Sequence, residues 1–184
     1  HDALDLIERR AREAKKHETV VEVLLGKMEH AEDGAPRAAL LRRLADTYEH
    51  GLGDLPRAFE AVTMALHVAP GDEEAVAVIE RLAAATGSWA QLVSEASQLA
   101  TDLTDATLAS AWWARLGVWY GTKLDRADYA LPSLRRALEL DARNVVAHAA
   151  LAEALRKQQK WAELADVLRA HVEVETRDQV KVDL

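Results

Sequence analysis

Apolar residues recur along the chain three and four positions apart, which is the spacing of one face of an α-helix. Leu41, Leu44 and Tyr48 follow this rule. Turn-forming residues separate such faces, as in Gly51 to Pro56 and at Pro70-Gly71. The pattern predicts an all-α chain of about ten helices, at 2–15, 18–32, 37–50, 56–69, 73–86, 89–102, 106–122, 127–141, 145–158 and 161–175.

The apolar pattern repeats with a period of 72 residues. Trp161-Ala162-Glu163-Leu164 follows Trp89-Ala90-Gln91-Leu92 at 161 − 89 = 72, and Tyr120 follows Tyr48 at 120 − 48 = 72. Each unit divides into two helical hairpins of about 36 residues, a known helical-repeat length. One hairpin cannot bury its apolar face alone, so hairpins stack into a right-handed α-solenoid with a concave groove. We predict a single array over 1–184, with antiparallel hairpins at about 1–34, 37–70, 73–103, 106–142 and 145–176.

The end of the chain looks unfinished. Val180, Val182 and Leu184 have the pattern of another apolar repeat face, so a partial eleventh helix is predicted within 177–184. A solenoid end normally carries a polar capping helix instead. The chain also starts at His1, with no initiator methionine. These features predict a fragment of a longer array.

One segment of this pattern matches a known family. Trp113-x-x-Leu116-Gly117-x-x-Tyr120, followed by Ala130, resembles the tetratricopeptide repeat signature. The segment from Leu41 to Pro70 resembles a looser copy, and both copies carry one extra residue in the turn between their helices. The resemblance covers essentially the whole chain. It implies stacked helical hairpins and a protein-binding role, but such repeats serve many unrelated systems.

The other hairpins depart from the signature at recognisable points. Glu8 and Glu80 stand where the family prefers a small residue. Trp89 and Trp161 open their helices with the aromatic residue that the family uses there, whereas His17 does not. Trp89, Trp161 and Trp113 are therefore predicted to be core residues.

Composition and motifs argue against several function classes. The net charge is −8 and no dense basic run occurs, which disfavours nucleic acid and anionic membranes as partners. The longest uncharged stretch, 82–94, is too short to span a bilayer. There is no cysteine, no catalytic triad motif and no phosphate-binding glycine loop. We therefore expect no enzymatic activity and no cofactor.

The seven histidines show no metal-ligand spacing on one helical face. His148 and His171 are the two that the hairpin pattern brings near each other, in the last hairpin. A metal site there would need further ligands. We therefore predict a partly buried histidine pair and no metal.

The groove of such an array is lined by the first helix of each hairpin. Arginine there can grip carboxylates with two hydrogen bonds, which makes an acidic or C-terminal peptide one conceivable ligand. The alternative is an ordinary solvated helix face. The candidate groove residues are Arg9, Arg42, Asp46, Glu49, Arg81, Glu153 and Arg156.

Two further tryptophans, Trp112 and Trp119, lie seven residues apart on one helical stripe. At the corresponding positions the other hairpins carry other residues, mostly small or aliphatic. Either the two rings fill one junction between hairpins, or they form an exposed aromatic anchor for a partner.

The main hypothesis from sequence is a protein-interaction scaffold that binds a peptide or helical segment of a partner in the concave groove. A structural spacer or self-associating segment of a larger repeat protein is the alternative. A third hypothesis is the regulatory arm of a multidomain enzyme.

Overall fold

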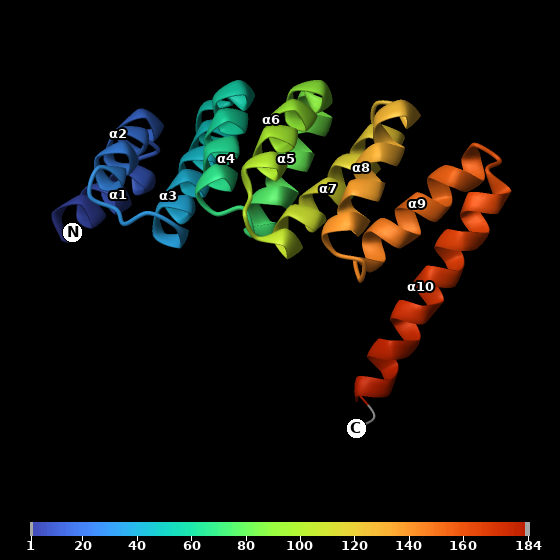
Figure 1. The fold of residues 1–184 in the computed structure, drawn as a ribbon. Coiled ribbons are helices and arrows are strands. Elements are labelled where there is room, and N and C mark those ends of the chain that lie inside the picture. Colours follow the sequence, from blue (N-terminus) through green and yellow to red (C-terminus); the bar gives the residue numbers. More distant parts are fainter. Residues whose placement is uncertain (1, 183–184) are drawn as a thin grey trace. The chain divides into compact units, whose positions relative to one another are not determined.

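The computed structural model describes the backbone of residues 2–182 and the side chains of residues 3–174. These residues form α-helices and contain no strand (Figure 1). The helices are α1 (Asp2–Glu13), α2 (His17–Met28), α3 (Ala35–Asp46), α4 (Leu55–Val68), α5 (Glu73–Thr86), α6 (Trp89–Asp102), α7 (Ala106–Thr122), α8 (Ala127–Leu140), α9 (Val145–Lys157) and α10 (Trp161–Val182). The predicted all-α class and the ten helices are confirmed. The chain forms two compact units, His1–Ser88 and Trp89–Leu184.

In the His1–Ser88 unit, α1 pairs with α2 and α3 pairs with α4, as the predicted hairpins at 1–34 and 37–70 require. α2 also packs on α3, and α4 packs on α5. Aspartates fix two helix starts: Asp54 accepts a hydrogen bond from the Arg57 backbone N–H, and Asp72 accepts one from Ala75. Such side-chain caps satisfy amide groups that have no partner inside the helix.

The predicted helix at 37–50 has different bounds in the structure. α3 begins at Ala35, with Pro36 in its first turn, and ends at Asp46. A π-helical segment, η1 (Thr47–Leu52), follows and ends at Gly53, whose φ of 67° favours glycine. Such a wide turn accommodates an additional residue. This explains how the extra residue of the Leu41–Pro70 copy fits without disturbing the helix pairing.

In the Trp89–Leu184 unit, α7 pairs with α8 and α9 pairs with α10, as predicted for 106–142 and 145–176. α6 packs on α7, α8 packs on α9, and α7 also lies beside α9. Leu134, Leu151 and Leu155 form the centre of one core cluster between α8, α9 and α10. The right-handed superhelix and a single array over 1–184 stay predictions.

The predicted eleventh helix is wrong. α10 runs unbroken from Trp161 to Val182, so there is neither a helix end at 175 nor a new start at 177. The physical reason is that no glycine or proline occurs between Trp161 and Val182, and nothing else there interrupts the hydrogen-bond ladder. The side chains of Val180, Val182 and Leu184 lie outside the described residues.

The two unexplained tryptophans belong to the core. Trp112 and Trp119 are almost completely buried, and their rings meet edge to face at 6.2 Å. Trp119 also contacts Trp89, with ring centroids 6.3 Å apart. The rings therefore fill the junction of α6 and α7, and the hypothesis of an exposed aromatic anchor at Trp112 and Trp119 is wrong. Aromatic rings in such geometry contribute packing energy beyond the area they bury.

Trp161 differs from its repeat partner Trp89. It is 61% exposed, so its predicted place in the core is wrong. The reason is that α7 packs on α6 and its Trp119 meets Trp89, while no described helix follows α10.

Candidate functional site

A cleft of about 440 Å³ lies where α7, α8 and α9 meet. Small residues form much of its lining: Gly117 and Gly121 on α7, and Ala150 and Ala154 on α9. Further lining residues are Val118, Thr122, Asp125, Ala127, Ala130, Leu134, Glu153, Lys157 and Gln158. The lining is therefore mainly apolar, with a few polar groups, which is the usual character of a binding pocket.

Gly117 fixes the geometry of this cleft. A Cβ atom at this position would lie 2.4 Å from Leu134 Cγ and 3.1 Å from the Ala130 carbonyl oxygen. Only glycine allows α7 to approach α8 so closely. At Gly121 a Cβ atom would lie 3.5 Å from Ala130 Cβ, which is an ordinary contact. The two glycines thus have different roles. Gly117 is needed for α7 to pack on α8, while Gly121 has no side chain and so leaves the cleft open.

Solved structures with a similar fold are tetratricopeptide-type repeat proteins. A crystal structure of MamA matches with a TM-score of 0.58 at 14% identity, over 100% of this chain and 95% of that one. MamA from Desulfovibrio magneticus RS-1 matches at 0.55 and 15% identity, over 96% and 95%. A tetratricopeptide repeat protein from Parabacteroides merdae matches at 0.53 and 16%, over 97% of this chain and 68% of that one.

The fold is tetratricopeptide-repeat-like. No protein-family model matches the sequence, and no curated protein matches it. At these identities the likeness concerns the fold alone. The small-residue position of the tetratricopeptide signature falls at Gly117, where the structure also requires glycine.

Most of the predicted groove residues of the tetratricopeptide-like array do not line the cleft. Glu153 does, and its carboxylate accepts a 2.7 Å hydrogen bond from Arg156, one turn along α9. Arg156 is therefore held beside the cleft rather than in it. Arg9 is exposed on α1, in the other unit.

The remaining candidates form ion pairs within the His1–Ser88 unit. Arg42 on α3 pairs with Asp72 at 3.0 Å and with Glu74, so it holds the start of α5. Arg81 on α5 donates two hydrogen bonds to Glu49, one at 2.8 Å, and they lower the pKa of the Glu49 carboxyl.

Asp46 completes this set of candidates. Asp46 is the last residue of α3, and its carboxylate lies 3.1 Å from Nδ1 of His50, which belongs to η1. The ion pairs of Arg42 and Arg81 favour the interpretation that these charges join different helices of the unit over the interpretation that they wait for a ligand.

Sequence reasoning missed a buried ionic cluster that joins α1, α2 and α3. Glu8 is 3% exposed and Lys27 is 7% exposed, and their charged groups lie 2.7 Å apart. Arg12 donates to Glu8 at 2.9 Å, and Arg43 pairs with the same oxygen. Asp5 also pairs with Lys27. The available signal was Glu8 at a position where the family prefers a small residue.

This ionic cluster makes the stability of the fold depend on pH. Burial alone would raise the pKa of Glu8, but hydrogen bonds from Lys27, Arg12 and Arg43 outweigh it and lower the pKa to about 2. Because the pKa is lowered in the folded protein, the charged Glu8 stabilises the fold at pH values above its unfolded pKa of 4.5, and this stabilisation is lost as the pH falls toward 2.

We expect the free energy of unfolding, measured in urea, to fall between these pH values. Glu8→Gln should fall less steeply over that range, and an unchanged slope would contradict the assignment.

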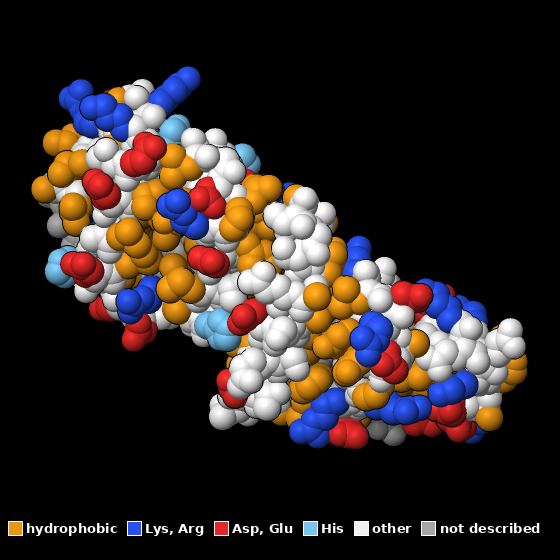
Figure 2. Space-filling view, turned by 90° about the horizontal axis from the view of Figure 1, so that it is seen from above, with side chains coloured by type: hydrophobic (Ala, Val, Ile, Leu, Met, Phe, Trp, Pro, Cys, Tyr) orange, Lys and Arg blue, Asp and Glu red, His pale blue; other side chains and the backbone are white. Residues whose placement is uncertain are grey.

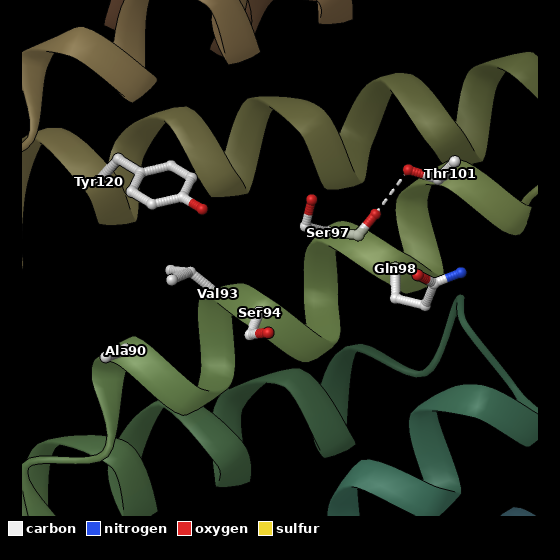
Figure 3. A pocket seen from close by; sticks show the side chains of 7 residues that line it. All are labelled: Ala90, Val93, Ser94, Ser97, Gln98, Thr101 and Tyr120. Carbon is white, nitrogen blue, oxygen red and sulfur yellow. Dashed lines mark hydrogen bonds between the residues drawn. The ribbon is translucent and has the colours of Figure 1, made fainter.

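A second, more polar pocket of about 390 Å³ lies along α6 (Figure 3). Figure 3 shows the Tyr120 hydroxyl pointing from α7 toward a row of short polar side chains that includes Ser94 and Ser97. Thr101 donates to the Ser97 carbonyl oxygen at 2.8 Å. No charged residue is among those that line this pocket, so it offers neutral hydrogen bonds only.

The predicted histidine pair is confirmed. The rings of His148 and His171 stack with centroids 5.4 Å apart and planes 6° from parallel. The Ala142 carbonyl lies 2.9 Å from His148 Nε2. Within the described part of the chain, no group of three or more histidine, aspartate or glutamate side chains is placed to hold a metal ion. No described helix is both long and apolar enough to cross a membrane.

Proposed function

We propose that this chain is a protein-interaction scaffold, and that the cleft between α7 and α9 receives a segment of a partner protein. The observation that carries this proposal is the apolar cleft of about 440 Å³, lined by helices from two successive hairpins. Helical repeats use the surface formed by successive first helices for binding. A cleft of this size accepts one or two side chains of an extended or helical segment.

The lining defines the chemistry of the segment. The glycine and alanine residues of the lining leave the cleft open to a large apolar side chain, such as leucine, methionine or phenylalanine. Glu153 and Lys157 lie one helical turn apart on α9, so the segment meets one negative and one positive group beside its apolar anchor. An acidic ligand gripped by arginines has less support, because Arg42, Arg81 and Arg156 already form ion pairs.

A structural spacer is the second candidate. It is favoured by the use of charged and aromatic side chains within the molecule, as at Arg42 and Trp112. The two functions differ in one respect that can be measured: a spacer has no need for an open cleft.

The test uses two neighbouring alanines of α9. Ala150 lines the cleft, whereas Ala149 is exposed and does not. A displayed library of random 12-residue peptides is selected on the wild-type chain, and the selected peptides are measured by calorimetry. We expect Ala150→Phe to weaken binding by about tenfold or more, since the ring occupies the space of the anchor. Ala149→Phe should bind as the wild type does. Equal affinities for all three proteins would place the site elsewhere.

A further inference from the structure

The turn between α7 and α8 holds an aspartate in a backbone conformation that favours glycine. Asp125 has a φ of 53°, in the left-handed region. Seventy-two residues earlier, the same place of the repeat is occupied by Gly53, whose φ is 67°. Glycine adopts this conformation freely, whereas a residue with a Cβ atom has a steric cost. The turn itself therefore gives no reason for a carboxylate, and residues held in this way are common at binding sites.

The Asp125 carboxylate has no counter-ion of its own. Asp125 is exposed and belongs to the lining of the cleft between α7 and α9. The two nearest cations in the sequence are engaged elsewhere: Arg126 pairs with Asp128 at 2.7 Å, and Lys123 Nζ lies 5.2 Å from the centre of the Trp89 ring. Within the described part of the chain, Asp125 forms no ion pair and no side-chain hydrogen bond. A cationic group that enters the cleft therefore meets this carboxylate without a competitor.

The other charged groups of the lining lie on α9. Glu153 pairs with Arg156 at 2.7 Å, so its charge is already balanced. Lys157 forms no ion pair with a described residue, but it lies in the last turn of α9, where a cation is favourable without any partner. Asp125 is thus the charge in this lining that the fold does not use. Figure 2 shows how the surface mixes such groups: exposed hydrophobic side chains lie between acidic and basic ones on the face that it draws.

We infer that the partner segment carries a lysine or arginine beside its apolar anchor, and that this basic residue pairs with Asp125. The inference rests on the proposed function, because it places the segment in the same cleft. The apolar anchor supplies most of the affinity by burial, while the ion pair selects the partner. Lys157 repels a basic residue, so the basic residue lies on the side of Asp125. The charges of the lining therefore also fix the direction in which the segment binds.

Charge variants of Asp125 test this inference, with peptides selected on the wild type from the displayed library of random 12-residue peptides as probes. We expect the selected peptides to carry lysine or arginine beside a large apolar residue. Asp125→Asn keeps a residue that tolerates the left-handed conformation but removes the charge, and should weaken binding about fivefold in calorimetry. Asp125→Lys should weaken it further. It should also bind a peptide whose basic residue is replaced by glutamate more tightly than the wild type does.

Asp125→Gly separates binding from folding. It removes the carboxylate and relieves the backbone, so it should weaken binding as Asp125→Asn does. Lys15→Gly is the matched control, since Lys15 has the same φ of 53° in the turn between α1 and α2, outside the cleft. We expect the two glycine variants to change the urea midpoint in the same direction and by similar amounts, because both changes act on the backbone alone. Lys15→Gly should leave peptide binding unchanged.

The failure of this inference and that of the proposed function give different results. Peptides that Ala150→Phe weakens but that bind Asp125→Asn and Asp125→Lys as they bind the wild type would overturn the inference and leave the proposed function standing. Selected peptides without a basic residue would overturn it in the same way. Peptides unaffected by Ala150→Phe would contradict both, because the cleft would not be their site. A urea midpoint for Asp125→Gly far below that of Lys15→Gly would assign the carboxylate to the turn itself and also contradict the inference.

Discussion

Glu8→Ala is expected to lower the free energy of unfolding by about 3 kcal/mol, because it leaves Lys27 buried without its main partner. The Lys27 ammonium is 7% exposed and would keep only Asp5, which is itself largely in water. Arg12 and Arg43 also lose their shared carboxylate, but both are partly exposed and can be hydrated. The measurement is urea unfolding followed by far-ultraviolet circular dichroism.

The double variant Glu8→Ala/Lys27→Leu separates charge from packing. Leu99 stands 72 residues after Lys27 and is buried, so this position of the repeat accepts leucine. We expect the double variant to recover most of the lost stability, since apolar groups can replace a buried ion pair at little cost. If the losses of Glu8→Ala and Lys27→Leu simply add, the two residues are not coupled and the ionic cluster is not what holds α1 to α2.

Gly117→Val is the second large effect, with an expected loss of about 3 kcal/mol. The Cβ atom alone would lie 2.4 Å from Leu134 Cγ, and the two methyl groups of valine add further volume where α7 contacts α8. Leu134 is buried, and the Ala130 carbonyl is backbone, so neither can move away freely. The expected result is a lower urea midpoint with α7 and α8 forced apart.

Gly121→Ala is the matched control for this prediction. It adds a methyl group one helical turn further along α7, at an ordinary contact distance from Ala130. Since alanine favours the helix over glycine, stability should stay the same or rise by up to about 1 kcal/mol. Equal losses at both positions would mean that α7 tolerates no side chain here, and that the close approach at Gly117 is not special.

The helical hairpins could be predicted because their signal is periodic and local. The 72-residue period and the breakers at Gly51 to Pro56 and Pro70 placed most helices within a few residues. Trp112 shows the limit of this reasoning. A tryptophan on a helical stripe has the same pattern whether a neighbouring helix covers it or not, so burial had to come from the structure.

The residues of the candidate site were harder to predict than the fold. The cleft is made by side chains that are small, such as Ala150 and Gly121, and a search for charged groups passes over them. The contact of Glu8 with Lys27 joins two helices through side-chain geometry that no motif records. Arg42 and Arg81 have the appearance of ligand-binding residues in sequence, yet their partners lie on neighbouring helices.

The tryptophans described above also give the two units different optical properties. All five lie in the Trp89–Leu184 unit, so intrinsic tryptophan fluorescence reports on that unit and not on His1–Ser88. Three of them, Trp89, Trp112 and Trp119, form one ring cluster whose emission should shift to longer wavelength when α6 leaves α7. Circular dichroism, in contrast, reports helices of both units. Overlaying the two signals during unfolding therefore tells directly whether the repeats melt as one cooperative body or as two.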